Sequence, residues 1–253
     1  MTTAELYARL DGMIPRSLSC EWDNDGLMCC PDGRREVRRV LIALDVTGEA
    51  AEAAVTGGYD LIVSHHPFIF KGLKSINEDN YISKKALELI RNGISVFSFH
   101  TRLDAVSGGV NDTLAELLEL EDIMPFGDEA IGRIGTLREE TDITQLALKL
   151  KTAIGAEGVF AADGGVPCKR VAVLGGNGSD DLEAALAAGA DTYISGTLKY
   201  HSMTDAHDMR VNLIEAGHFY TENPVCAVLK RMIEDIDSNI VCELYNSNKV
   251  KLI

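Results

Sequence analysis

Ile62-Val63-Ser64-His65-His66-Pro67 is a short apolar run that ends in two adjacent histidines and a proline. The continuous aliphatic residues of 61–63 predict a strand that is covered on both faces of a sheet. His65 and His66 then lie at the carboxyl end of this strand, the edge at which open α/β sheets bind ligands. Because neighbouring side chains of a strand point to opposite sides, two adjacent histidines suit two nearby metal ions better than one. The alternative interpretation is a histidine pair that only caps the strand at a turn.

The composition is typical of a globular protein with an acidic surface. The chain has 253 residues, of which 46% are hydrophobic and 25% charged, so it can bury a core as one large domain or two ordinary ones. The net charge of −15 argues against a nucleic-acid partner. Six cysteines without a C-x-x-C pair indicate reduced thiols rather than a zinc ribbon or a disulfide framework. No apolar run approaches membrane-spanning length, so we expect a cytoplasmic protein without a membrane partner.

Periodicity and turn signals predict alternating strands and helices in the first half of the chain. The elements are a helix at 6–13 capped by Thr2 or Thr3, a strand at 40–46, a helix at 49–56, the strand before His65, a helix at 82–92, a strand at 94–99 and a helix at 110–120. Strand, helix and strand with short loops form a βαβ unit, so its two strands should be parallel with a right-handed crossover.

The periodicity stops around 126–136, where three glycines predict a connector between two halves, 1–125 and 126–253. The second half predicts a helix at 143–154, strands at 171–174, 192–195 and 211–216, helices at 180–188 and 225–235, and a closing strand at 240–244. Repeated strands and helices of this kind predict an α/β fold with mostly parallel, or mixed, sheets and flanking helices.

The two halves repeat the same order of parts. Residues 40–64 correspond to 171–195, and the next strand ends in His100-x-x-x-Asp104 in one half and in His218-x-x-x-Glu222 in the other. A single H-x-x-x-D is common by chance, but the same spacing after equivalent strands is much less so. If the halves pack about a pseudo-twofold axis, their strand ends can face one cleft.

That cleft would hold four of the six histidines and two carboxylates, namely His65, His66, His100, Asp104, His218 and Glu222. Imidazole with carboxylate suits Zn, Mn, Fe or Ni, and the lack of cysteine disfavours a purely structural zinc site. Two close ions also need a carboxylate between them, for which Asp104 and Glu222 are the candidates. Alternatively, these side chains cap strand ends and bond to loops.

Two further segments permit more than one interpretation. Trp22-Asp23-Asn24-Asp25-Gly26-Leu27 contains the only tryptophan, and its Asp and Asn residues favour a turn. In a second interpretation, Asp23 or Asn24 reaches a pocket. Gly175-Gly176-Asn177-Gly178 follows a strand and suggests phosphate binding, but without the P-loop lysine a tight turn is expected instead.

Six motifs occur in order over nearly the whole chain: the Trp22–Leu27 segment, Ser64–Pro67, His100–Asp104 with Gly108–Asp112, Gly132–Gly135, Lys199–His201 and Gly217–Glu222. Together they resemble the GTP cyclohydrolase 1 type 2 family, also called NIF-three-like proteins. The resemblance implies two intertwined α/β repeats with a metal cleft between them, a dinuclear centre and a toroidal homohexamer.

The resemblance also implies roles for individual residues. It places the ligands of two divalent ions at His65, His66, Asp104, His218 and Glu222, with Glu222 as the bridge. His100 then lines the pocket or orients Asp104. One departure is Thr197, which stands where family members often have an acidic residue, so a carboxylate role cannot be transferred there. The connector is too short for the extra domain of longer members.

The first functional hypothesis is a metal-dependent hydrolase. A divalent ion lowers the pKa of bound water from about 15.7 toward 7 and so supplies hydroxide at neutral pH. By resemblance the substrate is a nucleotide such as GTP, attacked at its purine imidazole ring with release of formate. Lys199 and Arg102 are candidates to meet phosphates and His201 to move a proton, whereas His207 is expected at the surface. The second hypothesis is a non-catalytic metal-binding or regulatory assembly, since no nucleophile triad, P-loop or dinucleotide fingerprint adds evidence for catalysis.

Overall fold

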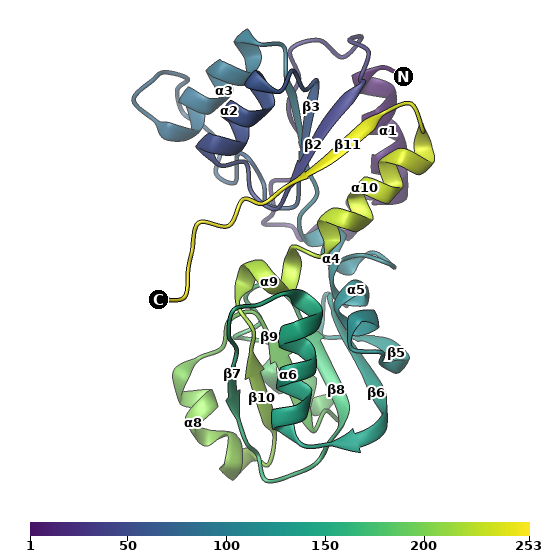
Figure 1. Cartoon of the computed structure of the whole chain (residues 1–253), viewed down its shortest axis with the longest axis vertical. Helices are drawn as coiled ribbons and strands as arrows, with labels where there is room; N and C mark the ends of the chain where they lie inside the picture. Colours follow the sequence, from purple (N-terminus) through teal and green to yellow (C-terminus); the bar gives the residue numbers. More distant parts are fainter. The chain divides into compact units, whose positions relative to one another are not determined.

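The computed structural model describes all residues from Met1 to Ile253, which form two compact units (Figure 1). The first unit comprises Met1–Val106 and Val225–Lys249, and the second unit comprises Ser107–Pro224 and Val250–Ile253. The chain therefore changes units at 106/107 rather than at 125/126, and its last helix and strand return to the first unit. The reason is pairing and packing, because Val241–Tyr245 lies parallel to Arg39–Ala43 in the first sheet.

The first unit is built around a sheet with strand order β1-β4-β3-β2-β11. Its strands are β1 (Gly26–Cys29), β2 (Arg39–Ala43), β3 (Leu61–Ser64), β4 (Ser95–Ser98) and β11 (Val241–Tyr245). Four strands are parallel and β1 is antiparallel to β4, which confirms the predicted βαβ pairing of β2 with β3. All four residues of β3 are buried, as expected for a strand covered on both faces.

Helices cover both faces of this first sheet (Figure 1). They are α1 (Thr3–Met13), α2 (Gly48–Thr56), α3 (Tyr81–Arg91), the short α4 (Thr101–Ala105) and α10 (Val225–Ile236), with a 3-10 turn at Arg16–Leu18. Thr2 begins α1 by accepting a hydrogen bond from the backbone N–H of Glu5, whose side chain accepts one from Thr2 N. On one face, α2 and α3 pack on a core that contains Leu41, Ile62 and Val96.

The second unit contains a mixed sheet with strand order β5-β6-β8-β9-β10-β7. Its strands are β5 (Glu121–Phe126), β6 (Gly132–Thr141), β7 (Phe160–Ala162), β8 (Cys168–Leu174), β9 (Thr192–Ser195) and β10 (Asn212–Glu215). Its helices are α5 (Val110–Leu117), α6 (Ile143–Ile154), α7 (Leu182–Ala187), α8 (Tyr200–Met209) and α9 (His218–Glu222). Strands β8, β9 and β10 are parallel, and the other pairs are antiparallel.

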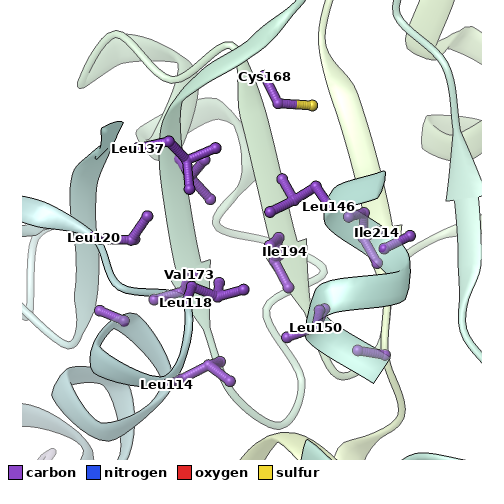
Figure 2. Packing of buried hydrophobic residues seen from close by; sticks show 14 of the residues in the cluster. Leu114, Leu118, Leu120, Leu137, Leu146, Leu150, Cys168, Val173, Ile194 and Ile214 are labelled. Carbon is purple, nitrogen blue, oxygen red and sulfur yellow. The ribbon is translucent and has the colours of Figure 1, made fainter. Parts of the chain in front are cut away.

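The core of the second unit shows why α5 belongs to it. Leu114 and Leu118 pack with Leu146 and Leu150 of α6 on the same side of the sheet, over Ile194 and other strand residues (Figure 2). The opposite face of the sheet carries a separate core that includes residues of α7 and α8. No helix of the chain combines the length and the apolar character that crossing a bilayer requires.

The predicted connector at 126–136 is wrong, because this stretch contributes to the β5–β6 hairpin. Gly127 lies in the loop of this hairpin, whereas Gly132 and Gly135 lie within β6. Gly132 pairs with Phe126 across the hairpin, and a Cβ at Gly132 would overlap the Phe126 ring. Glycine within a strand can allow another group to approach closely, but it has no side chain and so interrupts the alternation of apolar residues by which a strand is recognised in a sequence.

The two sheets share a core arrangement, β2-β3-β4 in one and β8-β9-β10 in the other. Ser64 pairs with Ser98 in the first unit, and Ser195 pairs with Glu215 in the second. His100 lies two residues after Ser98, whereas His218 lies three residues after Glu215. The H-x-x-x-D/E motifs therefore follow equivalent strands but are out of register by one residue, so His218 begins α9 whereas His100 precedes α4.

Candidate metal centre

Three imidazoles meet at the carboxyl edge of the first sheet. His65 and His66 follow β3 directly, and His100 follows β4 after one intervening residue. One ring nitrogen of each lies within 4.8 Å of the others, and the His65 ring centroid is 5.1 Å from that of His66 and 5.4 Å from that of His100. The parallel register of β3 and β4 ends both strands at the same level, which brings the histidines together.

A backbone carbonyl fixes the tautomer of His65. The ring is fully buried, and its Nδ1 lies 2.9 Å from the carbonyl oxygen of Phe99, which can only accept a hydrogen bond. In the neutral ring Nδ1 therefore carries the proton, and Nε2 has the lone pair that a metal ion needs. Nε2 lies 3.6 Å from Oδ1 of Asp104, which is carried by α4. An imidazole nitrogen and a carboxylate oxygen are thus close enough to bind the same metal ion.

Two carboxylates orient the other imidazoles in the same way. Oδ1 of Asp45, at the end of β2, lies 2.7 Å from Nδ1 of His66. Oδ1 of Asp23 lies 2.9 Å from Nδ1 of His100. Asp23 of the Trp22–Leu27 segment therefore contacts a candidate site residue. Asp45 was not predicted from the sequence, although an acid just after a parallel strand was the available signal.

Asp23 is held as a carboxylate. Burial by itself would raise the pKa of Asp23, but hydrogen bonds from His100 and Thr101 outweigh burial and lower that pKa to about 2. Thr101 donates twice to Oδ2, from its backbone N–H at 3.1 Å and from its hydroxyl at 2.7 Å. At neutral pH the ionised carboxylate therefore keeps the His100 ring in place.

In the second unit, α9 carries a histidine and a glutamate in contact. His218 is the first residue of α9 and Glu222 the last, so their side chains lie on one helix face four residues apart. His218 Nε2 is 3.0 Å from Glu222 Oε2. The Glu222 side chain is 6% exposed and that of His218 is 46% exposed, so the pair joins a buried acid to an accessible imidazole.

The Gly175–Gly178 loop forms a wall around Glu222. Gly176 has a left-handed backbone with φ +67°, and a Cβ there would overlap Oε1 of Glu222 and lie 3.0 Å from its Cδ. The Gly176 N–H also donates to the hydroxyl of Thr221 on α9, at 3.0 Å. The loop bends at Gly176, and the missing side chain there makes room for the Glu222 carboxylate, a role that was not predicted from the sequence.

Arg102 is a structural residue, and its predicted contact with phosphate is wrong. Its side chain is fully buried, with Nε 3.0 Å from Asp25 and Nη1 2.7 Å from Asp11. The guanidinium also lies over the Phe99 ring, 4.7 Å from its centroid. This enclosure holds α4 against the N-terminal segment and leaves the guanidinium inaccessible to a substrate.

The remaining predicted residues lie in the second unit. Lys199 pairs with Asp180, and His201 is exposed near the start of α8. His207 is exposed, as expected, and so is Thr197.

Comparison with known proteins gives consistent matches over the whole chain. The family model for Duf34/NIF3 (NGG1p interacting factor 3) matches residues 1–250. A protein of Clostridium perfringens named GTP cyclohydrolase 1 type 2 homolog is 34% identical over 239 residues, which cover 91% of each chain. A protein of Methanocaldococcus jannaschii with the same name is 31% identical over 249 residues, covering 96% of this chain and 98% of its own.

Solved structures show the same fold. A hypothetical protein from Staphylococcus aureus superposes with a TM-score of 0.87 at 27% identity, covering 100% of this chain and 99% of its own. Reduced HcgD from Methanocaldococcus jannaschii superposes with a TM-score of 0.83 at 27% identity, covering 96% and 97%. The mixed α/β architecture described above is therefore shared with these proteins.

Proposed function

Because the chain belongs to the Duf34/NIF3 family, we propose that it is a divalent-metal-dependent hydrolase of a nucleotide. The proposed ligands of two ions are His65, His66, Asp104, His218 and Glu222. The observation that carries the proposal is the fixed tautomer of His65, because an imidazole whose Nδ1 donates to a carbonyl has its lone pair on Nε2, the atom that binds a metal ion. By resemblance we also propose a homohexamer in the cytoplasm.

The chemistry of the donors fits a borderline divalent ion. They combine imidazole nitrogens with carboxylate oxygens and include no thiol, the mixture that suits Zn, Mn, Fe or Ni. Asp45 and Asp23 hold the rings of His66 and His100 through Nδ1, as carboxylates do behind metal-bound histidines. Their negative charge also offsets the positive charge of a bound ion.

A bound divalent ion would lower the pKa of water and offset charge that develops on a substrate. The chain's own groups hold that ion and set its surroundings. The loop at Gly176 confines the buried Glu222 carboxylate beside His218, and a backbone carbonyl keeps His65 in one orientation. The name of the relatives makes GTP the first nucleotide to test.

The alternative is a metal-binding protein without catalysis. It is favoured by the positions of the three side chains expected to serve a substrate. Arg102 is enclosed, Lys199 is paired with Asp180, and His201 is exposed near the start of α8. A hydrolase would therefore depend on other groups to bind phosphate and to move protons.

The test compares metal content and turnover in the same preparations. Purified protein is loaded separately with Mn, Zn or Fe, its metal is counted by mass spectrometry, and formate and phosphate release are followed with a panel of nucleotides. We expect His65→Ala and Glu222→Ala to lose metal and turnover, whereas His207→Ala, which changes an exposed histidine, keeps both. Normal metal binding without turnover of any nucleotide would favour the non-catalytic alternative.

A further inference from the structure

Two exposed aromatic rings stand beside the histidine cluster of the first unit. Trp22 is 60% exposed and Phe70 is 44% exposed, although both are large apolar side chains. Their ring centroids are 6.1 Å apart and their planes meet at 72°. The imidazole of His100 lies 6.0 Å from Trp22 and 6.1 Å from Phe70, again edge to face.

The pair is held from both sides. The amide of Asn24, two residues after Trp22, donates a hydrogen bond to the carbonyl of Ile69, which precedes Phe70. The carboxylate of Asp23 fixes the His100 ring against which both aromatics rest. The segments that carry Trp22 and Phe70 are far apart in sequence, but the hydrogen bond from Asn24 to Ile69 joins them. Both rings also contact the imidazole of His100.

The geometry leaves ring surface open to a ligand. An edge-to-face contact occupies at most one face of a ring, and the exposed fractions show that much of both rings faces water. Exposed lysines at 71 and 74 follow Phe70 in the same loop, in a chain whose net charge is −15. Aromatic faces next to cationic side chains are the combination that binds a base together with its phosphate.

We propose that Trp22 and Phe70 form a stacking platform for the purine ring of a nucleotide, next to the histidine cluster. The choice of a nucleotide rests on the proposed function, whereas the platform is inferred from the positions and the exposure of the two rings. Every base offers a π-face, so stacking supplies affinity while other contacts supply base specificity. Lys71 and Lys74 are positioned in sequence to meet the phosphate of the same ligand.

The chain carries its own probe, because Trp22 is its only tryptophan. Full-length protein is titrated with GMP, and with ribose 5-phosphate as the ligand that lacks a ring, while the tryptophan fluorescence is followed. We expect GMP to quench Trp22 saturably and ribose 5-phosphate to leave the fluorescence unchanged. Equal responses to the two ligands, or no response to GMP, would overturn the proposal.

Variants separate stacking from folding. GMP affinity measured by calorimetry should fall at least about fivefold in Trp22→Ala and in Phe70→Ala, the lower range for loss of one stacked base. Trp22→Phe should retain most of the affinity because it keeps a ring. Phe160→Ala removes an aromatic that is 67% exposed in the second unit and should leave GMP affinity unchanged.

The outcomes distinguish this inference from the proposed function. GMP quenching without turnover of any nucleotide supports the platform and counts only against the hydrolase. Turnover with unchanged GMP affinity in both alanine variants overturns only the platform. Sedimentation of the same variants tests a second copy of the chain as the occupant. Loss of assembly in Trp22→Ala without GMP quenching in the wild type would assign the rings to a subunit contact and refute the proposal.

Discussion

Replacing Gly176 by alanine tests the second-unit part of the proposed metal centre without touching a ligand. Gly176 has φ +67°, and its missing side chain leaves the space that the Glu222 carboxylate occupies. Gly155, at the C-terminus of α6, has nearly the same φ of +66° but open space around it. Gly155→Ala is therefore a matched control, because it introduces the same backbone strain as Gly176→Ala without the overlap with Glu222.

The two variants should differ in a predictable amount. Alanine in the left-handed region costs about 1–2 kcal/mol at either position. At Gly176, overlap with Glu222 adds about 1–3 kcal/mol, the cost of overpacking a buried site. Displacing the carboxylate should also weaken metal binding about 10- to 100-fold, the loss typical of disturbed groups around a metal ligand.

Denaturant unfolding with and without metal measures both effects. At a metal concentration of about 100 times the wild-type Kd, binding adds about 2.7 kcal/mol to the free energy of unfolding of wild type and of Gly155→Ala. A 100-fold weaker site adds only about 0.4 kcal/mol under the same conditions. The reasoning is refuted if Gly176→Ala gains as much stability from metal as Gly155→Ala does.

Three other perturbations have defined outcomes. Arg102→Met removes the nearer of the two cationic partners of the buried Asp25 carboxylate, since Arg16 lies 3.5 Å away and is partly exposed. It should lower the free energy of unfolding by about 3 kcal/mol in chemical denaturation, and adding Asp25→Asn should restore part of this loss. The pKa of Asp23 is lowered from 3.8 to about 2, so its contribution to stability is present above about pH 4 and disappears as the pH falls toward 2. After solvent screening this contribution is on the order of 1 kcal/mol, and the stability difference between wild type and Asp23→Asn should shrink over that range; a constant difference would contradict the assignment. Asp45→Asn weakens the orientation of His66 and should lower metal affinity about 10-fold in a competition titration with a chelating dye, while far-UV circular dichroism stays unchanged.

The sequence was sufficient for features that depend on neighbouring residues. The aliphatic run before His65 predicts a buried strand, and the structure confirms β3 and its parallel partner β2. Most helices follow the same logic, because an apolar period of 3.6 and a capping residue are local signals. The histidines at strand ends could also be found, since the carboxyl edge of a parallel sheet is fixed by the order of strands and helices.

Only the tertiary structure decided the features that join distant segments. The contacts of Asp45 with His66 and of Asp23 with His100 depend on which strands are neighbours, and the glycine at 176 is explained only by Glu222, which lies 46 residues later in the chain. The one-residue offset between the two H-x-x-x-D/E motifs likewise comes from strand register, which equal spacing does not reveal. Local sequence sets the periodicity and caps of each element, whereas register and burial result from packing between elements, and these place the side chains that do chemistry.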